Sequence, residues 1–139
     1  MTPEQKELVR NSFQSIAEIS GPVVMLFYGR LFQMDPELRP MFKQDIGVQG
    51  RKLIEMLTTL TSNLDHFEDL VPVLKALGQR HAGYGVRPEH YQAVTTSLIW
   101  ALGTALGWEF YPELRAAWQQ TIELAATVMK EGAAELPPE

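Results

Sequence analysis

His81 is the residue whose type and position point most directly to chemistry. It follows Leu70, Leu74 and Leu77 at steps of four, three and four residues, so it shares the apolar face of one helix. A buried imidazole without a partner is energetically costly. The ring therefore either makes ordinary hydrogen bonds inside the core or holds a ligand.

The other two histidines do not combine with His81 into a metal-binding motif. His66 lies fifteen residues before it and His90 nine residues after it, and no His-x-x-x-His or Glu-x-x-His pair occurs. One nitrogen is too few for a zinc site. It is sufficient for haem, whose iron has four porphyrin nitrogens and needs one axial histidine.

A second helix places a polar residue at the start of an apolar face. Gln49 leads a stripe at offsets 0, 4, 7, 8 and 11, whose other members are Leu53, Met56, Leu57 and Leu60. The alternative is that Gln49 is a solvated residue of the first helical turn.

Two aromatic residues precede this stripe in the chain. Tyr28 shares a helix face with Val24, Leu31 and Phe32, and its hydroxyl needs a hydrogen-bond partner. Phe42 follows a proline-rich corner. Each could be an ordinary core residue, but the order Tyr28, Phe42, Gln49, His81 is the order expected of a haem pocket.

Composition excludes several other classes of function. The 139 residues carry a formal net charge of −5 and no Lys/Arg cluster, so neither nucleic acid nor an anionic membrane is an expected partner. The absence of cysteine excludes disulfides, thiolate ligands and iron–sulfur clusters. With no signal segment and no membrane-length apolar run, we expect a cytoplasmic protein.

Helical periodicity and capping residues predict an all-α chain with about seven helices. We expect one domain over 1–139, with its core at about 3–131 and a flexible tail at 132–139. A loop is expected within 43–50, and no strand is predicted. The expected helices cover about 3–18, 20–34, 35–42, 47–62, 66–82, 88–106 and 112–131.

Four segments together resemble a known family. They are "LFYGRLFQMDPELRPMF" (26–42), "VQGRKL" (48–53), "LGQRHAGYGVRPEHY" (77–91) and "RAAWQQTIELAATVM" (115–129). With these four segments in this order, the chain resembles a bacterial single-domain globin, similar to the haem domain of flavohaemoglobins. The resemblance implies the globin fold and haem b (iron protoporphyrin IX).

The resemblance assigns a role to each pocket residue. It implies His81 as the proximal iron ligand, Phe42 stacked on the porphyrin, and Tyr28 with Gln49 as the distal hydrogen-bonding pair. The further residues it brings to the haem are Leu53 on the distal side, Val86 at the ring edge and Tyr91 on the proximal side. Flavohaemoglobin-like globins add a glutamate on the last helix, but that position is Ala133 here, with Glu131 two residues earlier.

Two further contacts complete the expected site. The second ring nitrogen of His81 needs a carbonyl acceptor, which we expect at Leu77 or Gly78 on the preceding turn. Lys52 and Arg51 could reach a haem propionate, although a solvated helix face is the simpler interpretation, as it is for Arg80.

The expected function is high-affinity binding or delivery of dioxygen at five-coordinate ferrous haem. Hydrogen bonds from Tyr28 and Gln49 to the partly charged ligand would each contribute roughly 1–3 kcal/mol. The alternative is a nitric oxide dioxygenase that depends on a separate reductase. A sensor or a haem-free interaction module has less support. Expected partners are dioxygen, nitric oxide and carbon monoxide, and the expected state is a monomer or weak homodimer.

Overall fold

A computed structural model of the chain describes residues 1–42 and 45–135, which form α-helices and short 3-10 helices without any strand. This confirms the all-α prediction. The elements are α1 (Pro3–Glu18), α2 (Ser20–Met34), η1 (Pro36–Met41), α3 (Ile46–Ser62), η2 (Leu64–Leu70), α4 (Val71–Gly83), α5 (His90–Leu106), η3 (Gly107–Glu109) and α6 (Pro112–Ala134).

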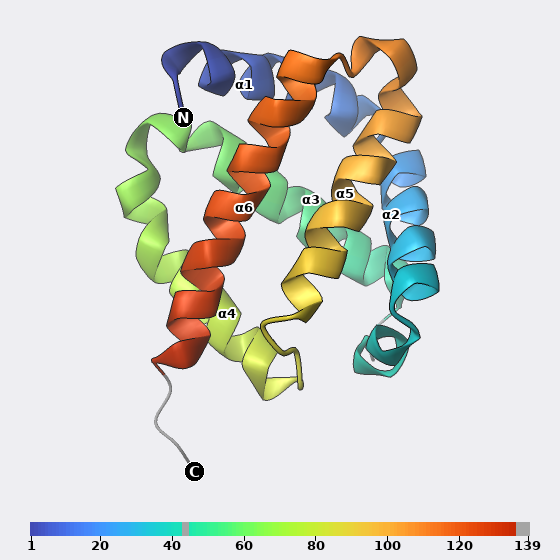
Figure 1. Cartoon of the computed structure of the whole chain (residues 1–139), viewed down its shortest axis with the longest axis vertical. Helices are drawn as coiled ribbons and strands as arrows, with labels where there is room; N and C mark the ends of the chain where they lie inside the picture. The colour runs from blue at the N-terminus through green and yellow to red at the C-terminus, as the bar shows by residue number, and fades with distance from the viewer. Residues whose placement is uncertain (43–44, 136–139) are drawn as a thin grey trace.

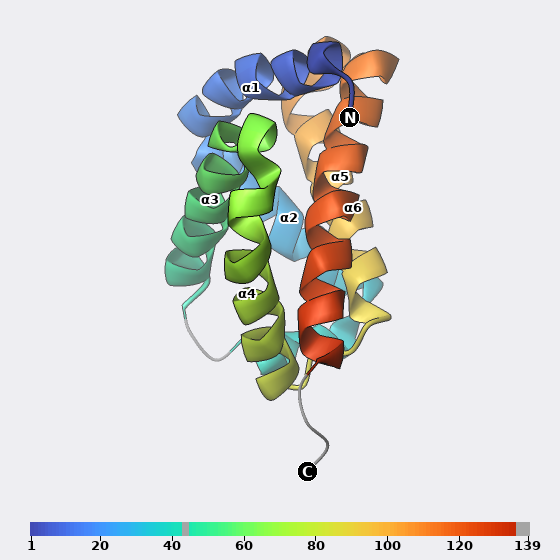
Figure 2. The ribbon, with the colours of Figure 1, turned by 90° about the vertical axis from the view of Figure 1, so that its left-hand side faces the viewer.

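The helices pack in pairs that are distant in sequence. α4 lies along α6, and α2 lies along α5 (Figure 1). α1 crosses the end of the molecule where α5 turns into α6, while α4 ends at the opposite end (Figure 2). No helix within the described ranges is long and apolar enough to cross a membrane.

The N-terminal helix begins as its sequence predicts. Thr2 and Gln5 form a reciprocal capping box, and Pro3 occupies the first turn, where its missing N–H costs nothing. α1 is joined to α6 by the buried Trp118, whose indole N–H donates to the Ser12 hydroxyl at 2.8 Å.

Two predicted helices differ from the structure because of prolines. The segment after Asp35 is the 3-10 helix η1, and Pro40 inside it supplies no backbone donor. The helix expected at 66–82 divides into η2 and α4, with non-helical φ/ψ angles at His66. α4 starts at Val71 because Pro72 is accepted in the first turn of a helix but not further inside.

Two helices extend into the segments where the sequence predicts a loop and a tail. α3 already begins at Ile46, capped by Asp45, whose side chain accepts the Gly47 N–H at 2.6 Å. α6 extends to Ala134, and Gly132 is buried within it, so 132–134 are helical where the sequence predicts a tail. Residues 43, 44 and 136–139, which include parts of both predictions, lie outside the described residues.

Two apolar clusters divide the core. The larger one joins α1, α2, α5 and α6, and the smaller one joins α3, α4 and α6 through Leu60, Leu70, Leu74, Ala125 and Val128. Leu70 and Leu74 therefore lie in the core, as the stripe predicts. Leu77 and His81, the last members of the same stripe, belong to neither cluster and stay partly exposed.

Candidate functional site

His81 lies in the last turn of α4 with a defined proton arrangement. Its Nδ1 is 2.8 Å from the carbonyl oxygen of Leu77, which is the hydrogen bond expected from the sequence. A carbonyl can only accept, so Nδ1 carries the proton and donates it. In the neutral ring, Nε2 then holds the free lone pair that a metal ligand requires.

Burial keeps this imidazole neutral. Desolvation lowers the pKa of His81 below its usual value of 6.5, and the neighbouring Arg80 charge lowers it further, while the Leu77 hydrogen bond opposes both effects. No three-ligand cluster of the described histidines and carboxylates includes His81. The ring is therefore suited to a group that needs a single protein nitrogen.

The turn after His81 is held by backbone hydrogen bonds. Val86 N–H donates to the His81 carbonyl at 3.0 Å, which places Val86 beside the end of α4. Gly85 adopts a φ of 97°, a conformation that favours glycine. Val86 is half-buried in this turn.

Tyr28, Phe32 and Phe42 form an aromatic group between α2 and the end of η1. The Phe42 ring lies edge-on to Tyr28, with centroids 5.5 Å apart, and to Phe32, at 5.3 Å. The structure therefore brings together two residues, Tyr28 and Phe42, that the sequence assigns to one pocket.

The Tyr28 hydroxyl is a buried donor. Burial raises the pKa of Tyr28 to about 12, so the hydroxyl keeps its proton at neutral pH. Its side chain is 6% exposed, and desolvation is the only cause of the pKa shift, without a contribution from a hydrogen bond to a described residue. A donor in this state is available to a ligand.

α3 supplies the remaining predicted distal residues. Gln49 and Leu53 are both half-buried and lie one helical turn apart, and Leu53 packs against the cluster that contains Tyr28. Gly50 between them contacts Val24 on α2. Lys52, like Arg51 and Arg80, is exposed.

Tyr91 near the start of α5 is 8% exposed, and its hydroxyl has no hydrogen-bond partner in the described part of the chain. Burial raises its pKa. Glu131 is exposed, and Ala133 occupies the position at which the resemblance implies a glutamate. Tyr91 therefore has no carboxylate partner on α6.

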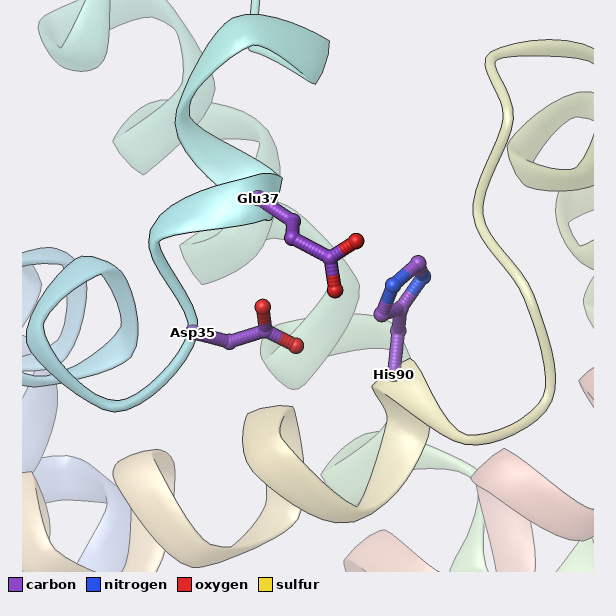
Figure 3. Close-up of side chains that lie close together, drawn as sticks. All are labelled: Asp35, Glu37 and His90. Carbon is purple, nitrogen blue, oxygen red and sulfur yellow. The ribbon is translucent and has the colours of Figure 1, made fainter.

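Sequence spacing did not reveal a polar cluster at the corner between α2 and α5. Figure 3 shows the carboxylates of Asp35 and Glu37 turned toward the His90 imidazole, and one ligand atom from each residue lies within 4.8 Å of the others. Asp35 and His90 are 55 positions apart in the chain, so no local motif marks this contact.

Two surface cavities lie away from His81. One of about 510 Å³ lies between α5 and α6 and includes Trp100 and Arg115 in its lining. The other, of about 420 Å³, lies between α2 and α3, with Val24 and Ile54 in its lining.

Comparison with known proteins supports one family. The Globin family model matches residues 26–129, well over half of the chain. The chain is 30% identical to a flavohemoprotein of Rhizobium meliloti over 93% of this chain and 33% of that protein, so it spans about a third of the length of this relative. It is 27% identical to a neuroglobin of Tetraodon nigroviridis over 95% and 92% of the two chains.

A solved structure shows the same fold. It is an engineered carbene transferase built on a candidate nitric oxide dioxygenase of Rhodothermus marinus. The TM-score is 0.87 and the identity 24%, with 97% of this chain and 94% of that chain covered. The family match, the relatives and the helical arrangement agree, and the chain therefore belongs to the globin family.

Proposed function

We propose that His81 is the axial ligand of a haem b, and that a diatomic ligand binds on the opposite side of the haem next to Tyr28 and Gln49. The observation that carries this proposal is the state of His81. Its Nδ1–H donates to Leu77, its lowered pKa favours the neutral ring, and its Nε2 lone pair is left for iron.

The residues present suit such a group. Membership of the globin family implies a haem cofactor, which supplies an iron atom able to bind diatomic molecules reversibly. Leu77 and His81 lie outside both core clusters, so their apolar and imidazole surfaces remain for another partner. Phe42 would stack on the porphyrin.

Tyr28 would stabilise the ligand by hydrogen bonding. Its hydroxyl is protonated and belongs to a buried side chain, and the Phe42 ring packs edge-on against the tyrosine ring. A donor that is already oriented in a dry site stabilises a partly charged ligand more than water does. Gln49 would provide a second donor from α3. These features favour tight binding of dioxygen, with nitric oxide and carbon monoxide as further ligands.

The other predicted contacts would support the haem and its ligand. Leu53 would provide the apolar distal wall, because it lies one turn after Gln49 and packs against the Tyr28 cluster. Lys52 is exposed and would reach a propionate. Val86 would contact the haem edge from the turn that follows His81, and Tyr91 would pack on the proximal side.

Nitric oxide dioxygenation is the second candidate function. It is favoured by the similarity to flavohemoproteins and to the structure built on a candidate nitric oxide dioxygenase. This chain would then bind dioxygen and nitric oxide, and a separate reductase would return the haem to its ferrous state. Nitric oxide consumption with and without an added reductase distinguishes this enzyme from an oxygen-binding protein.

Absorption spectra test the haem proposal directly. We expect the purified protein, or the protein reconstituted with haem, to show ferric, ferrous and oxygenated globin spectra. His81→Ala should lose the haem or its native axial coordination, and added imidazole should restore a histidine-like ferrous spectrum. His66→Ala is the matched control, because His66 is exposed on η2. The proposal would be contradicted if the wild-type protein does not bind haem, or if His81→Ala shows the same spectra as the wild type.

A further inference from the structure

The ring of His90 is held in one tautomer by the backbone. The backbone N–H of Arg87 donates to His90 Nδ1 at 2.9 Å, and the backbone N–H of His90 donates to the Arg87 carbonyl at 2.9 Å. Because Nδ1 accepts, the ring is neutral and its single proton lies on Nε2. This pair of bonds closes the turn that leads into α5.

The Nε2–H group of His90 is buried and has no hydrogen-bond partner among the described residues, in a side chain that is 1% exposed. Leaving such a donor unpaired in a protein interior is costly. Nδ1 is engaged with Arg87, so Nε2 is the nitrogen left for the carboxylates of Asp35 and Glu37 (Figure 3).

The two carboxylates differ in their other contacts. Glu37 is exposed and forms an ion pair with Arg87 at 3.4 Å. Asp35 is half-buried, and its side chain neither caps η1 nor forms an ion pair with a described residue. The buried Nε2–H of His90, which lacks an acceptor, therefore faces the half-buried Asp35 carboxylate, which has no donor among the described residues.

A metal ion does not fit this arrangement. Histidines that bind metals use a lone pair on one nitrogen and donate the N–H of the other. His90 has the opposite arrangement, because its lone pair accepts from Arg87 and its N–H faces the carboxylates. Coordination would require breaking the bond that closes the turn.

We propose that one ordered water molecule binds between His90, Asp35 and Glu37. It accepts from His90 Nε2–H and donates to the two carboxylates, so all three partners are satisfied. Two hydrogen bonds of about 2.8 Å that meet at a tetrahedral water span about 4.6 Å, which matches atoms lying within 4.8 Å of one another. We call this contact the His90 water bridge.

The bridge would make His90 a positioning residue for the site. On one side it holds Asp35, directly after the helix that carries Tyr28. On the other side it holds Arg87, directly after Val86, and the Val86 N–H donates to the carbonyl of His81. It therefore sets the distance between the two walls of the pocket. This role rests on the proposed function, whereas the water site itself does not.

The tautomer is tested by ¹⁵N NMR of the whole chain as purified, with any haem reduced and saturated with carbon monoxide to keep it diamagnetic. We expect a proton-free Nδ1 and an Nε2–H that exchanges slowly with water. A proton on Nδ1, or saturable binding of Zn²⁺ that Asp35→Ala abolishes, would overturn the proposal. The spectrum is informative even if the chain binds no haem, so the two proposals fail separately.

Paired variants test the positioning role. His90→Asn keeps an acceptor near the Nδ1 position for Arg87 but removes the Nε2 donor, and Asp35→Ala removes the acceptor. Each should speed haem transfer to a scavenger protein by roughly two- to tenfold. The double variant should be no faster than either single variant. Glu109→Gln, at an exposed position on η3, should leave the rate unchanged. Additive effects, or no effect, would overturn the role.

Discussion

Gly78 on α4 lies directly against the backbone of Met129 on α6, so closely that a side chain at position 78 would overlap the Met129 carbonyl. Gly132 on α6 meets the backbone of Lys75 in the same way. The Lys75–Glu135 ion pair, at 2.7 Å, lies next to this crossing. α4 is thus held close to α6 by Gly78, three residues before His81, and by Gly132 on the opposing helix.

Gly78→Ala should lower the free energy of unfolding by about 1–3 kcal/mol or more, because the opposing atoms are backbone and cannot move aside cheaply. Urea unfolding measures the effect. Gly29→Ala is the matched control, since no atom lies within 4 Å of the added Cβ on this exposed helix position. It should raise stability by about 0.5–1 kcal/mol. Equal effects of the two substitutions would contradict the close crossing.

Tyr28→Phe and Gln49→Leu should each speed oxygen release. A lost hydrogen bond of about 1–3 kcal/mol corresponds to roughly a 5- to 150-fold faster off-rate. Stopped-flow displacement by carbon monoxide measures it, and release of carbon monoxide itself should change less. Tyr84→Phe, on an exposed tyrosine, is the control. Unchanged oxygen release in both variants would exclude these two side chains as distal donors.

Phe42→Ala should loosen the haem more than it alters ligand chemistry. The Phe42 ring packs edge-on against Tyr28 and Phe32, so removing it takes away a wall of the pocket but no polar group. We expect faster haem transfer to a scavenger protein, with the positions of the absorption bands unchanged. Haem transfer at the wild-type rate would remove Phe42 from the haem contact.

His81 should make the haem-free protein less stable in mild acid. Its folded-state pKa lies below the unfolded value, chiefly because burial disfavours the charged ring. The unfolded chain therefore binds a proton that the folded chain does not. The stability contributed by the neutral His81 ring is fully present above the unfolded pKa of about 6.5. It falls as the pH drops toward the lower pKa of the folded state. Urea unfolding at pH 5.5 and 7.5 should show a larger loss for wild type than for His81→Gln, and an equal loss would contradict this assignment.

Tyr91→Phe should stabilise the protein by about 1 kcal/mol, because it removes a buried hydroxyl that lacks a partner in the described chain. Thermal unfolding compared with Tyr84→Phe, whose tyrosine is 65% exposed, provides the control. A loss of stability instead would mean that the Tyr91 hydroxyl makes a stabilising hydrogen bond.

Most helices could be predicted from sequence because their signals are local, whereas the roles proposed for the pocket residues depend on the resemblance to a family. The stripe that ends in His81, the capping box of Thr2 and Gln5, and the bond from His81 to Leu77 all depend on residues within a few helical turns. The sequence pattern predicts one helix over 66–82 with Pro72 near its first turns, and it missed that η2 would precede α4. In the structure α4 begins at Val71, which places Pro72 in the first turn.

Only the tertiary structure decided the contacts between distant segments. Asp35 and His90 meet because α2 and α5 run side by side, and Gly78 meets Met129 because α4 crosses α6 at backbone contact. The residues alone contain no periodic signal for either pairing. Such contacts depend on how whole helices pack, and helix packing is determined by the combined fit of many side chains rather than by any local sequence pattern.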